Sequence, residues 1–554
     1  MSDPGATAAS LHDDAEAGHL AVFDRAMLLV GRDAACRSLA QSLDSQPAQV
    51  WLQCARALLF RHDLDSAAML LRAAVARHAG DEDLRFALAG VQKQSHQVTD
   101  AEALLRELLT QHPGHAGAGF LLAQLLREQA RYQAMAETLR ALFTVPGRDT
   151  EQVIKAVELL DDAGRQADAA AICEAHLAGG CADARVHAYA GMLQIQLGQF
   201  ERARASYLHA IAHDARAFDW TIAVGLSSLQ RYADTSHPDF ALFRDALARP
   251  DIEEPARASL LFALAKAHDD IAEYATAAQY LSEANGLIHG ANPWPRKRWQ
   301  RAVQSRLSAR PWPPRQVTAP AWTPVFIVGV PRSGTTLVAE WLARYPDVRN
   351  RGELAALPRL EKQLEQASRD DRALLEHVAL AYRAELLQDD APARWYVDKE
   401  PLNLLRVDLI MSLYPNARII ICRRNARDTA VSLWSQHFSN SANGYAYDLA
   451  DTAAVIKGCS QLSAHWQARY PDAVRTIGYE HLTANAAASI RGLAAWLGLP
   501  ESDVQEMRAS VDSTISTGSL WQARQPVYQR SVERWKHYAP YLPALLRLPA
   551  DLAG

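Results

Sequence analysis

The chain is organised around Val325-Phe-Ile-Val-Gly-Val-Pro-Arg-Ser-Gly-Thr-Thr-Leu337. The first four residues form a short apolar run, which is typical of a buried parallel strand. Gly329 and Gly334 then bound a tight turn, and Thr335 and Thr336 open a segment with the apolar spacing of a helix. A strand, a glycine-bounded loop and a helix N-terminus direct backbone N–H groups and the helix dipole at one point. The stretch therefore predicts an anion-binding loop in an α/β domain.

The spacing of this loop resembles the Walker A pattern, G-x-x-x-x-G-K-[ST], but differs at the decisive position. Thr335 stands where the lysine that reaches the β- and γ-phosphates would be, and the cation of the loop is Arg332 instead. A kinase or nucleoside triphosphatase would be impaired without that lysine. We therefore expect a different phosphate-bearing donor.

The loop resembles the 5′-phosphosulfate loop of sulfotransferases that use 3′-phosphoadenosine 5′-phosphosulfate (PAPS). The resemblance covers residues 323–554, and its nearest form is the protein-tyrosine sulfotransferase type. Eukaryotic members of that type are membrane-anchored in the secretory pathway. The resemblance implies that the donor is bound by Arg332, Ser333, Gly334, Thr335 and Thr336. It also gives Arg332 a catalytic role.

The composition is that of a globular protein with more than one hydrophobic core, since the chain has 554 residues and 49% hydrophobic content. The net charge of −5 shows no nucleic-acid footprint. The six cysteines are scattered without a C-x-x-C pair, which favours reduced thiols over a zinc site. The sequence has no signal-like N-terminus and no long apolar span, so we expect a cytoplasmic protein without a membrane anchor.

The chain repeats every 34 residues between about residues 45 and 220. The small position of the repeat recurs at Ala67, Ala101, Met135, Ala169 and Ala203. Three residues earlier stand Leu64, Val98, Tyr132, Gln166 and Phe200, and a further copy follows at Tyr274 and Ala277, after a segment that contains Pro238 and Pro250. This period resembles the tetratricopeptide repeat (TPR), whose helical pairs stack into a superhelix with a concave surface. We expect the array to bind a peptide or partner protein; the alternative is a structural extension that packs on the enzyme.

The predicted fold is an α-helical TPR solenoid followed by an α/β, P-loop-like sulfotransferase domain with a central parallel sheet. The predicted parts are a TPR-like helical repeat domain in residues 1–290, a linker rich in Pro, Trp and Arg in residues 291–322, and the sulfotransferase domain in residues 323–554. Proline blocks regular helix continuation, which marks the linker as a boundary. Its tryptophans indicate that it packs between the two domains.

Two motifs in the second half carry the predicted chemistry. Asp347-Val-Arg-Asn-Arg-Gly-Glu353 resembles, with one extra residue, the string that supplies the catalytic glutamate of protein-tyrosine sulfotransferases. The resemblance implies that Glu353 takes the proton of the acceptor; the alternative is a glutamate at a helix N-terminus. Lys399 ends a predicted strand, where open α/β sheets bind ligands. The resemblance implies that Lys399 neutralises charge on the sulfuryl group and the leaving phosphate.

A second phosphate site is predicted after the strand Arg418-Ile-Ile-Ile-Cys422. Arg424 follows this strand, and Ser432 lies about two turns into the next helix, so both can grip one phosphate. The pair resembles the 3′-phosphate motif of PAPS enzymes. Two phosphate-binding groups in one domain distinguish a PAPS site from an ordinary mononucleotide site.

Further candidate residues lie in the rest of the second half. By resemblance, Tyr479 contacts the nucleotide, and Ser519 and Arg534 lie near the sulfate and the 3′-phosphate. The alternatives to Arg534 are Arg524 and Arg530. His437 is a rival base because small-molecule sulfotransferases use a histidine, but its setting differs from theirs. We expect His437 to line the acceptor pocket or only to pack.

The combined interpretation is an enzyme that moves a sulfuryl group from PAPS to an acceptor hydroxyl without a metal. The glutamate string and the segment from Ser519 to Trp535 resemble those of protein-tyrosine sulfotransferases, and this resemblance implies that the acceptor is a tyrosine of a protein or peptide bound by the TPR array. The phenol of a tyrosine, with a pKa ~10, is easier to deprotonate than an alcohol. One alternative is sulfation of a carbohydrate or small-molecule hydroxyl. Another is a TPR scaffold with a nucleotide-sensing, catalytically weak domain. Nucleic-acid and membrane partners are not expected, and a homodimer is compatible with the sequence.

Overall fold

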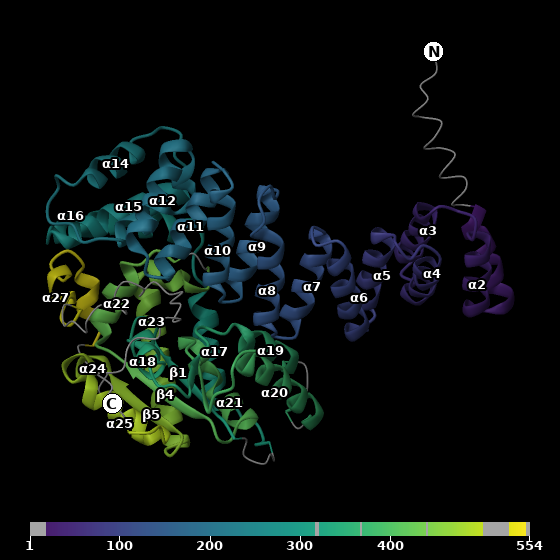
Figure 1. The fold of residues 1–554 in the computed structure, drawn as a ribbon. Helices are drawn as coiled ribbons and strands as arrows, with labels where there is room; N and C mark the ends of the chain where they lie inside the picture. Colours follow the sequence, from purple (N-terminus) through teal and green to yellow (C-terminus); the bar gives the residue numbers. More distant parts are fainter. Residues whose placement is uncertain are drawn as a thin grey trace. The chain divides into compact units, whose positions relative to one another are not determined.

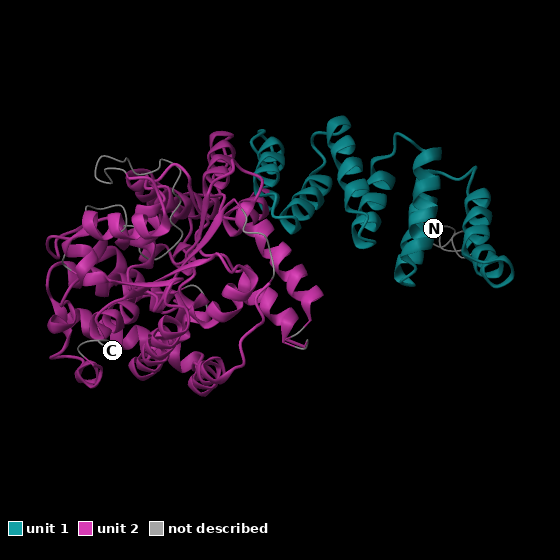
Figure 2. Ribbon diagram, turned by 90° about the horizontal axis from the view of Figure 1, so that it is seen from below, with its two compact units in different colours: residues 1–152 teal, residues 153–554 magenta. Residues whose placement is uncertain are grey.

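The computed structural model describes residues 18–315, 321–365, 368–369, 371–438, 441–501 and 531–549. The chain divides into two compact units, residues 1–152 and 153–554 (Figure 2). The predicted helical repeats continue from the first unit into the second. The domain boundaries proposed at residues 290 and 322 stay a prediction.

The 34-residue period appears as pairs of helices (Figure 1). After α2 (Arg32–Ser42), the first helices of the pairs are α3 (Ala48–Phe60), α5 (Glu82–Gln94), α7 (Ala116–Glu128), α9 (Thr150–Asp162), α11 (Ala184–Gln196) and α15 (Glu254–Asp270). The second helices are α4 (Leu64–Arg77), α6 (Val98–Gln111), α8 (Tyr132–Phe143), α10 (Gln166–Ala178), α12 (Phe200–His213) and α16 (Tyr274–Ala291). Every second helix therefore begins three residues before the predicted small position. All six small positions are fully buried, which confirms the repeat.

The repeat is interrupted between α12 and α15, in the segment that contains Pro238 and Pro250. This segment forms η1 (Ala217–Trp220), α13 (Ile222–Ser228) and α14 (Pro238–Leu247). The buried carboxylate of Asp239 accepts two hydrogen bonds from Arg204, at 2.7 and 3.0 Å, and one from the Tyr232 hydroxyl at 2.8 Å. The ion pair joins Arg204 of α12 to Asp239 of α14 and so fixes the irregular segment. Removal of Arg204 would leave the buried charge of Asp239 without its cationic partner.

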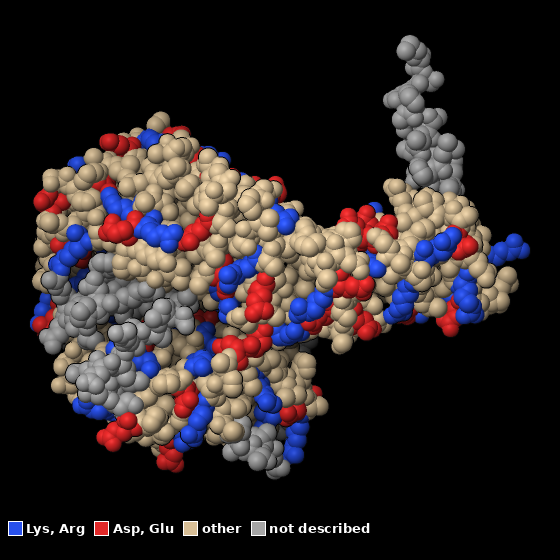
Figure 3. Space-filling model, viewed as in Figure 1, with Lys and Arg blue, Asp and Glu red and all other residues tan. Residues whose placement is uncertain are grey.

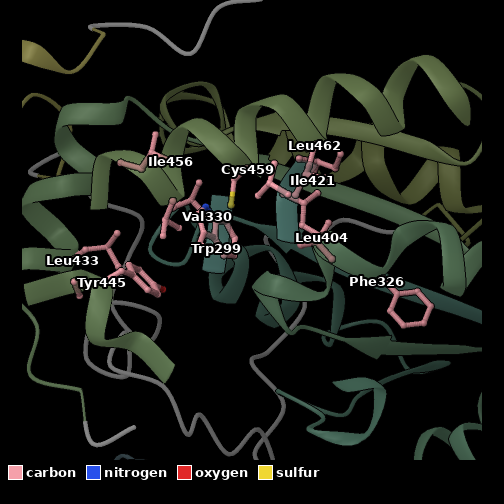
Figure 4. Close-up of a cluster of buried hydrophobic side chains, with 14 of the residues drawn as sticks. Trp299, Phe326, Val330, Leu404, Ile421, Leu433, Tyr445, Ile456, Cys459 and Leu462 are labelled. Carbon is pink, nitrogen blue, oxygen red and sulfur yellow. The ribbon is translucent and has the colours of Figure 1, made fainter. Parts of the chain in front are cut away.

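Residues 291–322 contain a helix that the sequence analysis did not predict, α17 (Arg296–Ser308). Pro295 is its N-cap, so the prolines flank the helix instead of interrupting it. Trp299 packs on α23 (Leu449–Arg469), and its Nε1 donates a hydrogen bond to Ala454 O at 3.1 Å (Figure 4). A Cβ at Gly458 would lie 2.8 Å from Trp299 Nε1, so glycine is needed for this close approach.

The second unit contains a parallel sheet, as predicted, and its strand order is β2-β3-β1-β4-β5. The strands are β1 (Thr323–Gly329), β2 (Val348–Asn350), β3 (Trp395–Asp398), β4 (Arg418–Arg423) and β5 (Val474–Gly478). The remaining described elements are α18 (Thr335–Leu342), α19 (Ala356–Leu364), α20 (Arg372–Leu387), η2 (Pro401–Arg406), α21 (Val407–Leu413), α22 (Ala426–Trp434), η3 (Ser441–Tyr447), α24 (Tyr479–Ala484), α25 (Ala486–Leu497), α27 (Trp535–Tyr538) and η4 (Pro543–Arg547). The central strand β1 is buried at every position after Thr323.

Alternate side chains of β1 enter two different hydrophobic cores. Val325 and Ile327 pack in a cluster with residues of α18 and α25. Phe326 and Val328 pack in a second cluster, which includes Phe262 of α15 and also residues of α16 and α17. The last helical pair of the repeat region and the sheet therefore share one core. Burial of one such large apolar side chain stabilises the fold by about 1.5–3 kcal/mol.

The surface carries both signs of charge. On the face in Figure 3, acidic and basic side chains are interspersed over the described part of the chain. No helix among the described residues is both long and apolar enough to cross a bilayer.

Candidate active site

The five strands bring the predicted site residues to one edge of the sheet. Arg332 follows β1, Glu353 follows β2, Lys399 follows β3, Arg424 follows β4 and Tyr479 follows β5. Because the strands are parallel, their carboxyl ends lie at the same edge, where open α/β sheets bind ligands. The strand order puts Glu353 and Lys399 on one side of the loop after β1, and Arg424 and Tyr479 on the other. The topology thus separates the groups predicted for chemistry from those predicted for the 3′-phosphate.

The loop after β1 needs both of its glycines. Gly329 has φ 145°, and a Cβ there would lie 2.4 Å from Cys422 O of the neighbouring strand. Gly334 has φ 98° and caps α18; its Cβ would lie 2.7 Å from the Tyr479 ring. Arg332 adopts φ 73°, a left-handed conformation that costs a non-glycine residue about 1–2 kcal/mol. The loop is therefore held in a strained shape by its surroundings.

Hydrogen bonds join this loop to the predicted 3′-phosphate group. Arg332 Nε donates to Ser432 Oγ at 3.1 Å, and Arg424 Nη1 donates to Arg332 O at 3.0 Å. Arg424 Nη2 donates to Ser531 O at 2.6 Å, and the Arg424 guanidinium lies over the Tyr479 ring at 4.5 Å. The structure therefore brings Arg332, Arg424, Ser432 and Tyr479 together.

Two buried polar atoms at this place have no hydrogen-bond partner among the described residues, Ser333 Oγ and Arg424 Nε. Ser333 is 2% exposed and Arg424 is 7% exposed; Thr335 and Thr336, which open α18, are also buried. A buried polar group left unpaired costs about 1–3 kcal/mol, which an anionic oxygen would offset. Burial lowers the pKa of Arg424, and a bound anion would counteract this shift because it stabilises the charged guanidinium. These residues fit a phosphate-bearing ligand.

Glu353 and Lys399 form an ion pair in which Lys399 Nζ donates to Glu353 Oε1. Lys399 is 3% exposed, whereas the Glu353 side chain is 39% exposed. Lys399 N also donates to Gly352 O at 2.8 Å, which ties the end of β3 to the Glu353 loop. Burial, followed by the negative charge of Glu353, raises the pKa of Glu400 to about 7. The predicted base and the predicted cation therefore lie in direct contact.

Asp398 is a site residue that the sequence analysis did not single out. Its carboxylate accepts hydrogen bonds from the Tyr382 hydroxyl, from Asn403 Nδ2 at 3.0 Å and from Leu354 N at 3.4 Å. Complete burial raises its pKa to about 8. Asp398 precedes Lys399 and bonds to the residue after Glu353, so it links the two halves of the ion pair. The only sequence signal for Asp398 is its place at the end of an apolar strand, which does not reveal its partners.

The remaining predicted residues are His437, Arg534 and three residues outside the described chain. Burial lowers the pKa of His437, whose ring packs edge-to-face on Phe262 of α15 at 5.4 Å between ring centroids. Arg534 Nη2 donates to Asp269 Oδ1 of α15 at 2.9 Å. Outside the described residues lie Ser519, Arg524 and Arg530. Among the described residues, no cluster of three His, Cys, Asp or Glu side chains is arranged to hold a metal ion.

The comparison with known families matches the part of the chain that carries this site. Residues 324–503 match the model of the Sulfotransferase family. These residues form a sulfotransferase domain. The sulfotransferase domain includes the loop after β1 and all the predicted site residues up to Tyr479. With the helical repeats that precede it, the chain has a TPR-plus-sulfotransferase architecture.

Curated relatives align with parts of the chain. An uncharacterized protein of Aquifex aeolicus is 27% identical over 398 residues, which cover 66% of this chain and 51% of the relative. Protein-tyrosine sulfotransferase 1 of Danio rerio is 30% identical over 125 residues, which cover 20% of this chain and 35% of the relative. The human protein-tyrosine sulfotransferase 1 is 31% identical over 125 residues, which cover 20% and 34%. This chain thus spans about half of the first relative and about a third of the other two.

Two solved structures each resemble part of the chain. The sulfotransferase domain of the Synechococcus PCC 7002 olefin synthase has a TM-score of 0.31 and 16% identity, and covers 41% of this chain and 91% of that chain. A tetratricopeptide repeat protein from Parabacteroides merdae has a TM-score of 0.25 and 15% identity, and covers 43% and 93%.

Proposed function

We propose that this chain transfers a sulfuryl group from PAPS to an acceptor hydroxyl. The proposal rests on one observation: the anion-binding loop after β1 is hydrogen-bonded both to Arg424, which follows β4, and to Ser432 of α22. A nucleotide with phosphate groups at both its 5′ and 3′ positions needs two such sites side by side. The family match over residues 324–503 supports the same activity.

The donor would be held by the loop after β1 and by Arg424 and Ser432 beside it. The backbone of the loop and the hydroxyls of Ser333, Thr335 and Thr336 would bind the 5′-phosphosulfate. Arg424 Nε and Ser432 Oγ would bind the 3′-phosphate. PAPS, when bound, supplies an activated sulfuryl group whose bond to the 5′-phosphate oxygen breaks during transfer.

Glu353 and Lys399 would have separate roles in the transfer. Glu353 takes the proton of the acceptor hydroxyl while the acceptor oxygen forms its bond to sulfur. Lys399, now paired with Glu353, would turn to the oxygen of the leaving phosphate once the donor brings negative charge beside it. Lys399 and Arg332 then stabilise charge that develops in the transition state, as basic groups do in phosphoryl transfer. The released products are 3′-phosphoadenosine 5′-phosphate (PAP) and the sulfated acceptor.

The proposed acceptor is a tyrosine of a protein or peptide. Support comes from the alignment with proteins named protein-tyrosine sulfotransferase. A carboxylate base suits a phenol, because a phenol of pKa ~10 loses its proton more readily than an alcohol. The helical repeats would hold the polypeptide around the tyrosine, since stacked helical repeats provide extended binding surfaces.

The test is transfer from sulfur-labelled PAPS by the purified full chain. The acceptors are a tyrosine-containing protein, the same protein with its tyrosines replaced by phenylalanine, a small phenol and an oligosaccharide. Label on the first protein and the phenol, but not on the phenylalanine version, is the expected result. Label on the oligosaccharide alone would contradict the tyrosine acceptor and keep the sulfotransferase. Failure of all acceptors, together with failure to bind PAP, would overturn the proposed function.

A further inference from the structure

The closing segment, residues 531–538, lies directly beside Arg424. Its Ser531 O accepts the hydrogen bond from Arg424 Nη2. The carboxylate of Asp428 in α22 accepts hydrogen bonds from the backbone N–H groups of Glu533 at 2.7 Å and Trp535 at 2.9 Å. Glu533 has φ 62°, so this carboxylate holds a turn in which a non-glycine residue is strained.

The helical repeats hold the same segment from a second side. Asp269, near the end of α15, accepts hydrogen bonds from Arg534 Nη2 at 2.9 Å and from the Tyr538 hydroxyl. The His537 ring stacks on Tyr274, the first residue of α16, at 4.5 Å between ring centroids. The last helical pair therefore contributes a carboxylate and an aromatic ring to the position of this segment.

Asp269 also balances the charge beside the proposed 3′-phosphate site. Arg424 donates to Ser531 O, and the N–H groups of Glu533 and Trp535 donate to Asp428, so Arg534 lies on a short turn beside Arg424. Burial lowers the pKa of Arg424, and the positive charge of Arg534 acts in the same direction. Like charges at short range repel each other in a partly buried setting. The carboxylate of Asp269 offsets this repulsion, so Arg534 can remain near Arg424 before a phosphate binds.

We propose that Asp269 is a positioning residue for the donor site: it fixes Arg534 and the closing segment against Arg424, so that α15 and α16 help to set the affinity for the 3′-phosphate. This inference rests on the proposed function. Asp269 does not touch the donor and acts through Arg534 and Tyr538. The repeat region is then part of the donor site's support and not only a binding surface for the acceptor.

The ion pair is mostly buried, since the side chains of Asp269 and Arg534 are only 21% and 24% exposed. Loss of one partner of such a pair is expected to lower the Tm as well as the ligand affinity. A positioning role is therefore recognised by the ratio of two ligand affinities and not by the Tm, because a purely structural loss would affect both ligands equally.

The experiment measures the Kd of PAP and of 5′-AMP, which lacks the 3′-phosphate, by calorimetry on the full chain. Asp269→Asn should raise the Kd of PAP about tenfold and leave that of 5′-AMP unchanged, because only PAP uses Arg424 and its neighbours. Asp269→Glu should recover part of the loss. Glu283→Gln is the matched control, since Glu283 of α16 pairs with Arg257 of α15 at 3.0 Å, away from the closing segment. It should change neither Kd.

An unchanged ratio of the two Kd values in Asp269→Asn would overturn the inference, whether both values stay the same or both rise by the same factor. Should Asp269→Asn fail to fold, Tyr538→Phe removes one of the two donors to Asp269 and is expected to give a smaller rise for PAP alone. An unchanged ratio there overturns the inference equally. If the unsubstituted chain does not prefer PAP to 5′-AMP, the proposed function falls as well. If the unsubstituted chain and the Asp269→Asn variant prefer PAP to 5′-AMP by the same factor, only this inference is overturned.

Discussion

Arg332 Nε donates a hydrogen bond to Ser432 Oγ at 3.1 Å, which joins the loop after β1 to α22 at the carboxyl ends of the strands. The residue proposed for the sulfuryl group thus contacts the residue proposed for the 3′-phosphate. The carbonyl of Arg332 also accepts from Arg424, so the two proposed phosphate sites share one strained residue. A ligand that fills both sites should stabilise the fold more than a ligand that fills one.

The first prediction is therefore about donor choice. PAP should raise the Tm of the full chain clearly, because a ligand that binds only the folded state at 100 times its Kd adds about 2.7 kcal/mol of stability. ATP with magnesium should raise it far less, since it lacks a 3′-phosphate for Arg424 and the loop lacks the Walker lysine. A thermal melt with each nucleotide measures the difference. Equal shifts from both nucleotides would contradict the PAPS assignment.

Arg424→Ala should weaken PAP binding roughly 10- to 100-fold, because it removes a charge-assisted contact to phosphate worth about 1.5–3 kcal/mol. Calorimetry with PAP measures the loss. The control is Arg475→Ala: Arg475 lies on β5 of the same sheet, and its exposed guanidinium donates to Gly492 O at 3.0 Å. The control should bind PAP as the unsubstituted chain does. A similar loss in both variants would mean that Arg424 has no specific role.

The parts of the fold that sequence predicts well are local. The loop after β1 follows from adjacent residues, and the repeat follows from a fixed period, so both could be read along the chain. The helix α17 was missed because prolines stand on both sides of it, where they suit a helix boundary. Asp398 was missed because a single acid at a strand end gives no sign of Tyr382 and Asn403 beside it.

The contact between Asp269 and Arg534 could not be predicted from the sequence at all. The two residues are 265 positions apart, on a repeat helix and on the closing segment. Neither has a local pattern that points to the other, since a repeat helix carries many exposed acids. Only the fold reveals that the carboxylate of one helix neutralises an arginine beside the proposed donor site. Pairings of this kind depend on tertiary packing and leave no periodic signal.

The third prediction concerns the proposed base. Glu353→Gln should leave the Kd of PAP almost unchanged, because glutamine is nearly isosteric and the carboxylate does not bind the nucleotide in this proposal. The kcat for a phenol should fall by about 10²–10⁴, the usual contribution of general acid–base catalysis. Steady-state kinetics with a saturating acceptor measures kcat. An unchanged kcat would exclude Glu353 as the base and make His437 the first residue to test.

The fourth prediction is a pH dependence of stability that arises from Asp398. Burial raises its pKa to about 8 in the folded chain, against roughly 3.9 when unfolded. Between these values the folded state binds more protons, so this carboxyl stabilises the fold at low pH and loses that contribution as the pH rises toward 8. Asp398→Asn cannot ionise and should lose less stability over this range. Its Tm relative to the unsubstituted chain should therefore rise between pH 5.5 and pH 8.5. A constant difference would show that Asp398 is ionised throughout.

The last prediction concerns the first compact unit. Deletion of residues 1–147 removes α2 to α8 and keeps α9 and every described site residue. If the repeats hold a polypeptide acceptor, this deletion weakens the binding of a whole-protein acceptor and does not change the transfer step. The KM for a protein acceptor should rise about tenfold or more, while PAP affinity and the kcat for a small phenol stay the same.

A deletion up to residue 322 is the wrong version of that experiment. It would remove Phe262 and Trp299 from the core that also contains Phe326 and Val328 of β1, so we expect it to yield insoluble protein. The shorter deletion avoids this, and its melting curve with PAP checks that the second unit is folded. An unchanged KM for the protein acceptor would show that the first unit does not hold the substrate. The proposed support of the donor site by α15 and α16, by way of Asp269, would not be affected by that result.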